Sequence, residues 1–324
     1  MVDRSGSRVR GGPGNDQSLL AHNTVTSLAH GSLPTPTPYG VGRTDAIQSQ
    51  QVREFCQFLA HEWVGNRHHS YAVPPRGKSS AWSRTVNGNW STVGLAEAVA
   101  KFSWSGKGFS ESSAERDGLA SDLQSAIQRS ANDEVCAILR TIMHWGGVDN
   151  KYRQKGTFEW IEQNADEISA RISKAVHLIK DEKASLESFD GVNLIMNSTM
   201  TKIVSLPDPE QKLVIYDGRV GGALGFFVAR FAEERAIHQY DVANQLLFAV
   251  DREPKRTPET NRIHFPALFG KARDRCHASM VRRASQLIGH VAEECQATPR
   301  EIEAALFMWG YSVAEFSGRR FGRA

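Results

Sequence analysis

The sequence predicts a mainly α-helical protein with little strand. Apolar residues recur at spacings of three and four along most of the chain after residue 45, which places them on one face of a helix. Only residues 212–216 (KLVIY) look like a strand, and this segment is short. No repeat of fixed period is visible.

The N-terminal segment differs in composition from the rest of the chain. Residues 1–40 are rich in Gly, Ser, Thr and Pro. Such a segment buries too little apolar surface to offset the entropy lost on ordering. We therefore expect a flexible arm over residues 1–40 and one helical domain over residues 41–324.

Five helical faces can be placed by their apolar spacing. A loop rich in Pro and Gly and an aromatic stretch separate the first face from the others. Two consecutive glycines, Gly146 and Gly147, end the third of these helical segments. The faces run through residues 45–63, 119–127, 135–143, 161–179 and 281–291.

The last predicted helix has a clear start signal. Thr298 stands at the N-cap position, Pro299 at the first helical position and Glu301 three residues after the cap. This order is typical of a capping box, in which the threonine and glutamate side chains bind each other's backbone N–H groups. Its apolar face continues to Trp309.

Composition and cysteine spacing indicate a reduced intracellular protein. The 39 Lys and Arg residues exceed the 36 Asp and Glu residues by a net charge of only +3, which neither requires nor opposes a nucleic-acid partner. The four cysteines are far apart and form no C-x-x-C pair, so neither a disulfide framework nor a zinc ribbon is supported. They are Cys56, Cys136, Cys276 and Cys295.

Other classes of protein lack their signals in this chain. No apolar run is long enough to span a bilayer, and the N-terminus has no signal-peptide core, so we expect a cytoplasmic protein without a membrane partner. Walker A, Rossmann and G-x-S-x-G motifs are absent, and we expect no cofactor. The cluster of His61, Glu62, His68 and His69 lacks the H-E-x-x-H spacing, so we assign no metal.

The segment from Gly191 to Phe227 carries the candidate chemistry. Residues 191–205 predict a turn followed by a helix whose last residues include Lys202, and the prolines at 207 and 209 end that helix. Asp217 then precedes a run of small and apolar residues. Taken alone, Asp217 can be an ordinary N-cap and Lys202 an ordinary solvated lysine.

Glycines in the run after Asp217 favour a functional role. They lower helix propensity, so the run is not optimised for helix stability. They also permit the close approach of a second backbone or of a phosphate. The glycines are Gly218, Gly221, Gly222 and Gly225.

This segment resembles a known family. Thr201-Lys202, a link that contains prolines, and then an apolar triplet with Asp217 and x-R-V resemble the bacterial 8-oxoguanine DNA glycosylase-like proteins of the helix-hairpin-helix DNA glycosylase superfamily. The resemblance covers residues 189–227 and implies a helical helix-hairpin-helix glycosylase fold. The turn at residues 189–193 keeps one glycine of the hairpin and has Asn193 in place of a second. The spacing from Lys202 to Asp217 is also a few residues shorter than in the better-known members of the superfamily.

The resemblance implies roles for both side chains. In this superfamily a lysine on the second hairpin helix and an aspartate before the next helix face a nucleotide that is flipped out of the duplex; Lys202 and Asp217 match them. Asp217 would stabilise an oxocarbenium-like sugar and orient water. Lys202 would attack C1′ and form a Schiff base, which gives lyase activity, or would hold a phosphate or the departing base.

Base-pocket and DNA-contact residues are also expected. A flipped base needs aromatic or apolar walls, although each aromatic candidate can instead belong to the core or surface. A basic cluster can bind phosphate or can be a solvated helix face. The pocket candidates are Trp82, Trp90, His144, Trp145, Phe316 and Phe321. The phosphate candidates are Arg219, Lys271, Arg273, Arg275, Arg282 and Arg283.

The leading hypothesis is a monomeric DNA glycosylase that removes a modified base and leaves an abasic site. The resemblance implies that the base is an oxidised purine such as 8-oxoguanine, in base excision repair, or a phage base such as glucosylated hydroxymethylcytosine, in antiviral defence. One alternative is a non-catalytic helical module that binds DNA through its basic cluster. Another is a structural or regulatory helical protein without a nucleic-acid role.

Overall fold

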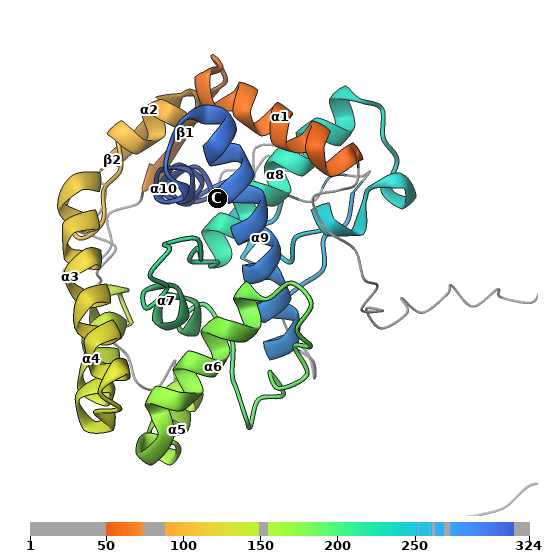
Figure 1. Ribbon diagram of the computed structural model, residues 1–324. Coiled ribbons are helices and arrows are strands. Elements are labelled where there is room, and N and C mark those ends of the chain that lie inside the picture. Colours follow the sequence, from red (N-terminus) through yellow and green to blue (C-terminus); the bar gives the residue numbers. More distant parts are fainter. Residues whose placement is uncertain are drawn as a thin grey trace, which may run out of the picture. The chain divides into compact units, whose positions relative to one another are not determined.

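The computed structural model is mainly helical (Figure 1). It describes residues 50–73, 88–148, 155–251, 253–258, 260, 263–268 and 273–313. The expected arm at residues 1–40 lies outside these ranges. The principal elements are α1 (Gln50–Val64), β1 (His68–Val73), β2 (Gly88–Val93), α2 (Gly94–Ala100), α3 (Phe109–Gln128), α4 (Asn132–Trp145), α5 (Lys155–Gln163), α6 (Ile168–Lys180), α7 (Met200–Ser205), α8 (Gly218–Glu234), α9 (Arg273–Cys295) and α10 (Pro299–Trp309).

Helix α8 lies in the core. Residues 218–229 are all buried, in agreement with a helix that is apolar all round its surface. Helix α10 packs against α8, α9 and α2, while the short helix α7 contacts both α4 and α6 (Figure 1). The packing therefore brings α7, which carries Lys202, into the same helical unit as the N-terminus of α8, which follows Asp217.

The predicted start of the last helix is confirmed. Thr298 Oγ1 accepts from the N–H of Glu301, and the Glu301 carboxylate accepts from the N–H of Thr298 at 2.7 Å. Both halves of the capping box are present, with Pro299 in the first turn. A capping box satisfies backbone donors that a helix leaves unpaired, so the sequence alone fixes this boundary.

The strand prediction at residues 212–216 is wrong. Four consecutive backbone N–H groups, from residues 212 to 215, donate to side chains and cannot form a ladder. The acceptors are the carboxylate of Asp208 for the first two, then Ser285 Oγ and Glu303 Oε2. The side chains of other elements thus replace the neighbouring strand.

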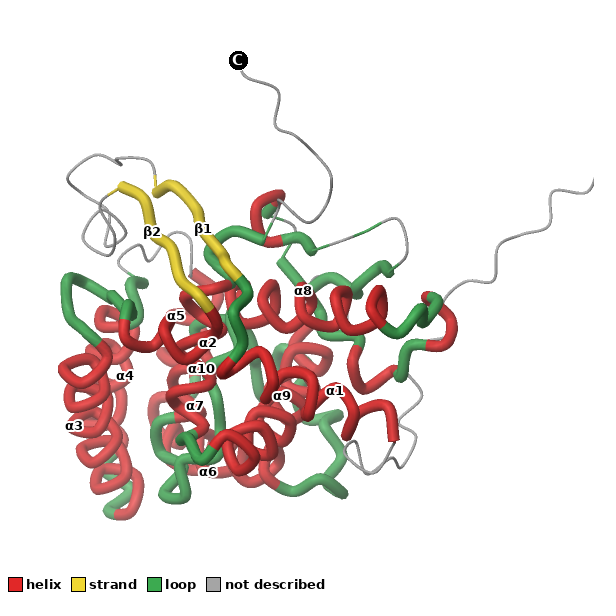
Figure 2. The backbone as a smooth tube through the Cα atoms, turned by 90° about the horizontal axis from the view of Figure 1, so that it is seen from above, coloured by secondary structure: helices red, strands yellow, loops and turns green. Residues whose placement is uncertain are grey.

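The described part of the chain instead contains one antiparallel pair, β1 and β2, at an edge of the helices (Figure 2). On its inner face, the Tyr71 hydroxyl donates to the carbonyl oxygen of Met308 at 2.9 Å. His69 Nε2 donates to the carbonyl oxygen of Trp309 at 3.0 Å, and the two rings stack with centroids 4.5 Å apart. These bonds satisfy carbonyls at the end of α10.

Two other helix boundaries differ from the prediction. The face expected over residues 161–179 is split into α5 and α6 by the 3₁₀ turn Ala165–Glu167, and Asn132 Oδ1 accepts from the N–H of Ser169 at the new helix start. The helix expected within residues 191–205 begins only at Met200. Asn197 Oδ1 accepts from the N–H groups of Thr199 and Met200, so it caps α7 there.

Candidate active site

Lys202 and Asp217 line the same pocket. Its volume is about 240 Å³, slightly below the roughly 300–1,000 Å³ of typical ligand pockets. Residues from α3, α7, α10 and the start of α8 contribute to its wall. The two residues that the sequence singles out are therefore brought together around one cavity, together with Trp145 at the end of α4.

Asp217 is the N-cap of α8. Its Oδ1 accepts from the N–H groups of Arg219 at 2.9 Å and Val220 at 3.1 Å. Within the described part of the chain, Oδ2 forms no hydrogen bond, while the residue lines the pocket. One oxygen of the carboxylate therefore fixes its orientation through the helix, and the other retains its capacity to interact with a ligand.

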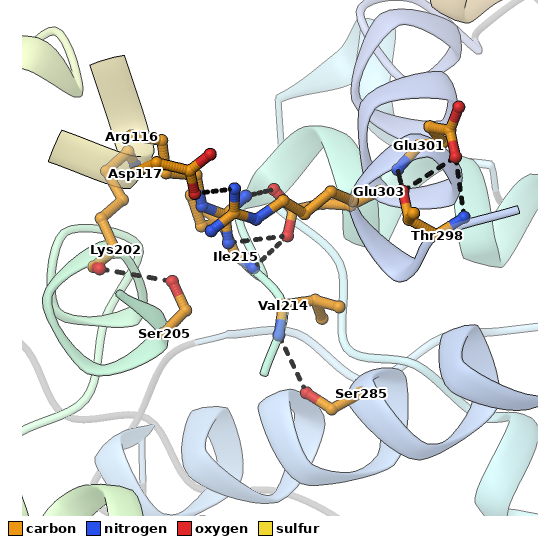
Figure 3. A network of polar contacts seen from close by, with 11 residues as sticks. Arg116, Asp117, Lys202, Ser205, Val214, Ile215, Ser285, Thr298, Glu301 and Glu303 are labelled. Carbon is orange, nitrogen blue, oxygen red and sulfur yellow. Dashed lines mark hydrogen bonds and ion pairs between the residues drawn. The ribbon is translucent and has the colours of Figure 1, made fainter. Parts of the chain in front are cut away.

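The backbone just before Asp217 is held by three side chains. The N–H of Val214 donates to Ser285 Oγ at 3.1 Å, and the N–H of Ile215 donates to Glu303 Oε2 at 2.8 Å (Figure 3). The next residue contributes its carbonyl oxygen, which accepts from His277 Nε2 at 2.9 Å. Successive residues are thus fixed to α9 and α10, which makes the position of Asp217 rigid.

Lys202 reaches the pocket past a glycine. A Cβ atom on Gly146 would lie 2.4 Å from Lys202 Cδ and 2.8 Å from Cε. The Nζ amine donates to the carbonyl oxygen of Ser198 at 2.8 Å and, within the described ranges, forms no ion pair. Gly146 at the end of α4 therefore provides the space that the lysine side chain occupies.

The environment of Lys202 lowers the pKa of its amine. Burial lowers its pKa from the ordinary value, because desolvation penalises the charged form. The nearby carboxylates of Asp217 and Glu303 oppose this shift, and Arg219 adds to it. A lysine with a lowered pKa has a larger fraction of nucleophilic amine near neutral pH.

The glycines after Asp217 approach protein backbone. A Cβ on Gly221 would meet the carbonyl oxygen of Ala249 at 2.9 Å, and one on Gly222 would meet that of Arg256 at 2.9 Å. A Cβ on Gly225 would instead meet the ring of Pro258 at 2.7 Å. These glycines let the segment after residue 248 pack against α8, so they do not require a phosphate as the sequence hypothesis allowed.

Part of the predicted base pocket is found at the cavity. Trp145 lines it, whereas His144 is exposed and does not. Trp90 lies in the core, where its Nε1 donates to the carbonyl oxygen of Lys101 at 3.1 Å, so we withdraw it from the pocket. The candidates Trp82, Phe316 and Phe321 lie outside the described residues.

Aromatic residues that the sequence did not single out complete the wall. Trp104 and Phe307 line the pocket and lie edge to face with ring centroids 5.6 Å apart. Phe102 and Phe109 line it as well. The sequence carried a weak signal for Trp104, which stands in an aromatic stretch, but no spacing connects that stretch with α10.

The predicted basic cluster is divided by the fold. Arg219 is buried, with its guanidinium over the rings of Phe307 and Tyr311, so it is not exposed for a phosphate contact. Arg282 donates to carbonyl oxygens at the C-terminal end of α6 and just beyond it, which gives it a capping role. The prediction that these two residues contact DNA phosphates is therefore wrong.

The other members of that cluster keep their assignment as a prediction. The side chains of Arg273 and Arg275 are exposed at the start of α9. Arg283 donates to the carbonyl oxygen of Asn244 at 3.0 Å and is partly exposed. Lys271 lies outside the described residues.

The turn at residues 189–193 already contains an anion. Asp190 Oδ1 accepts from the N–H groups of Val192 at 2.8 Å and Asn193 at 2.7 Å. These bonds lower the pKa of the Asp190 carboxyl to about 2, so it is ionised at neutral pH. The two N–H groups that would face a phosphate in a glycine-rich hairpin are occupied by this carboxylate.

The buried His277, which binds the backbone just before Asp217, makes the stability of the folded state sensitive to acid. Burial lowers its pKa to about 4, against about 6.5 in an unfolded chain. Above pH 6.5 the imidazole is neutral in both states and has no effect. As the pH falls from about 6.5 to 4, only the unfolded state takes up the proton, so the folded state loses up to about 3 kcal/mol.

We therefore expect His277→Gln to flatten the acid dependence of stability. Urea unfolding of wild type and variant at pH 7 and pH 4.5 would measure it, because the carboxylates contribute equally in both proteins. The half-exposed His290 on the same helix provides the control variant His290→Gln. Equal loss of unfolding free energy in wild type and His277→Gln would contradict the prediction.

Comparisons with known proteins add no family to this geometry. No protein-family model, curated protein or solved structure matches the chain. Within the described ranges, no group of His, Cys, Asp and Glu side chains could hold a metal ion, and no helix is long and apolar enough to cross a membrane.

Proposed function

We propose that this chain is a DNA glycosylase that binds a flipped modified base and hydrolyses its N-glycosidic bond. The observation that carries the proposal is the pocket shared by Asp217 and Lys202. A carboxylate fixed at a helix N-terminus and a partly buried lysine face one cavity with aromatic walls. This combination suits a reaction that generates a cationic sugar beside a planar leaving group.

Asp217 supplies the charge that the reaction needs. Breaking an N-glycosidic bond places positive charge on the sugar, and a preorganised carboxylate stabilises that charge without reorganising. The two N–H bonds to Oδ1 provide this preorganisation, and Oδ2 is the oxygen that faces the sugar or the attacking water.

Lys202 offers an alternative nucleophile. Its amine can attack C1′ in place of water, release the base and form an imine with the opened sugar. The lowered pKa favours this role, since the neutral amine carries the lone pair. If water is instead the nucleophile, the cationic form of Lys202 can hold the departing base or a neighbouring phosphate.

The aromatic wall suits a base outside the stack. Extrusion of a nucleotide costs a few kcal/mol, which stacking against aromatic side chains offsets. Trp104, Trp145 and Phe307 supply such surfaces beside the carboxylate. The modified base is an oxidised purine such as 8-oxoguanine or a phage base such as glucosylated hydroxymethylcytosine, in repair or in antiviral defence respectively.

Base release is the direct test. Duplex and single-stranded DNA would be prepared unmodified, with 8-oxoguanine and with glucosylated hydroxymethylcytosine, and incubated with the protein. We expect alkali-labile abasic sites in one modified DNA and none in unmodified DNA. Salt-sensitive DNA binding without base release from any of these substrates would favour a non-catalytic module, and no DNA binding at about 50 mM salt would reject both.

A further inference from the structure

A buried ion pair forms part of the pocket wall. Arg116 of α3 and Glu303 of α10 both line the cavity and are only 7% and 8% exposed. Arg116 Nη1 donates to Glu303 Oε1 at 2.8 Å (Figure 3). Replacing such a buried pair by apolar residues of similar size is often neutral or stabilising, so stability alone does not account for its place in a ligand cavity.

The hydrogen-bonding capacity left on this pair is unequal. Glu303 Oε2 accepts from the N–H of Ile215 at 2.8 Å and lies 3.5 Å from Arg116 Nη2. Oε1 has Arg116 Nη1 as its partner and retains a lone pair. The guanidinium carries five N–H donors, more than this carboxylate uses. The pair can therefore accept one further N–H and donate to an adjacent acceptor.

We infer that Arg116 and Glu303 bind the Watson–Crick edge of the flipped base, and that this edge carries an exocyclic amino group beside a ring nitrogen that accepts a hydrogen bond. Glu303 Oε1 accepts from the amino group, and Arg116 donates to the ring nitrogen. Cytosine and adenine bases present such an edge, whether or not they are modified elsewhere on the ring. This inference rests on the proposed function, because it takes the pocket to be a base pocket.

Guanine fits the same wall less well. Its Watson–Crick edge, N1–H and the N2 amino group, presents two neighbouring N–H donors, which pair best with both oxygens of a carboxylate. In Glu303, Oε2 already accepts from two donors, the N–H of Ile215 and Nη2 of Arg116, so only Oε1 retains a lone pair. Of the two modified bases considered above, the structure thus favours the cytosine derivative over 8-oxoguanine.

A purely structural role for Glu303 makes a different prediction. Glu303 and Ser285 hold neighbouring N–H groups of the segment before Asp217, but Ser285 does not line the pocket. Ser285→Ala therefore loosens that segment without changing the pocket wall. Glu303→Gln keeps an oxygen for Ile215 and replaces the carboxylate that faces the base.

Binding of free bases separates these roles. Dissociation constants for cytosine, adenine, guanine and N4,N4-dimethylcytosine would be measured by saturation-transfer NMR with wild type, Glu303→Gln and Ser285→Ala. Glu62→Gln, which removes the charge of a buried carboxylate that pairs with the partly exposed Arg67 and does not line the pocket, controls for the loss of a buried charge. Thermal unfolding of each variant would check that it folds.

We expect wild type to bind cytosine or adenine more tightly than guanine, and to bind cytosine more tightly than its dimethylated form. Glu303→Gln should weaken binding of the preferred base roughly tenfold or more and reduce the discrimination, since a hydrogen bond to a charged group is lost. Ser285→Ala and Glu62→Gln should retain both the affinity and the discrimination of the wild type. The cytosine and adenine arms decide between a pyrimidine and a purine ligand.

Several results would overturn the inference: guanine bound best, no base bound, or equal effects of Glu303→Gln and Ser285→Ala. The proposed function fails separately. Base binding that depends on Glu303, without base release from DNA, would reject the glycosylase activity and support base recognition by Arg116 and Glu303. Base release by wild type together with unchanged base preference in Glu303→Gln would support the glycosylase activity and reject base recognition by Arg116 and Glu303.

Discussion

Asp217→Asn should abolish base release while leaving the fold and DNA binding close to those of the wild type. Asn is as good an N-cap as Asp, so the amide oxygen can still accept the N–H groups of Arg219 and Val220. The lost charge at the start of α8 costs only about 0.3–1 kcal/mol of stability. The variant thus removes the negative charge and keeps the geometry.

The expected loss in rate is large. Removing a preorganised group that stabilises transition-state charge typically lowers kcat roughly 10²–10³-fold. Single-turnover release of the modified base would measure it, with DNA affinity and thermal unfolding recorded on the same preparation. Turnover close to that of the wild type would reject the assignment of Asp217.

Another pocket carboxylate provides the matched control. Asp251 also lines the cavity, and its Oδ2 lies 3.8 Å from Arg256 Nη1. It does not cap a helix, and it is about half exposed, so water screens its charge. We expect Asp251→Asn to lower the rate far less than Asp217→Asn. Equal losses would indicate that the net charge of the pocket matters and not the fixed carboxylate.

Local signals in the sequence predicted those parts of the structure that depend on neighbouring residues. The capping box of α10 and the N-cap position of Asp217 need only a few consecutive residues, and both were found from the sequence. Residues 212–216 were misjudged because their N–H groups bind side chains that are distant in sequence, such as Ser285 and Glu303. Tertiary contacts override a local strand propensity there.

The candidate site shows the same division. Lys202 and Asp217 could be singled out because they flank one short connection. Arg116 and Glu303 are separated by 187 residues, and no spacing in the sequence connects them. Arg282 looked like a member of a basic surface, yet its partners are carbonyl oxygens at the end of α6, which only the fold brings to it.

Lys202→Gln should remove the covalent adduct that borohydride traps between the protein and DNA. An amide has no nucleophilic lone pair comparable to that of an amine, so the imine cannot form. We also expect base release to fall, roughly 10²-fold if the lysine takes part in the rate-limiting step. Loss of the adduct with full retention of base release would show that water is the nucleophile.

Gly146→Ala tests the same residue without changing its chemistry. The backbone of Gly146 has φ −72° and ψ 7°, which alanine adopts without strain. Its methyl group, however, would overlap Lys202 Cδ and Cε and must displace the lysine side chain. We therefore expect Gly146→Ala to lose the trapped adduct as Lys202→Gln does, with an intact amine.

The matched control is Gly118→Ala, because a Cβ at Gly118 meets no atom within 4 Å. Gly118 lies inside α3, where alanine is favoured over glycine by roughly 0.5–1 kcal/mol, so this variant should be at least as stable and fully active. If Gly146→Ala traps as much DNA as Gly118→Ala, the space beside Gly146 does not position the Lys202 amine. If only Gly146→Ala fails, the position of Nζ in the pocket matters as much as its lone pair.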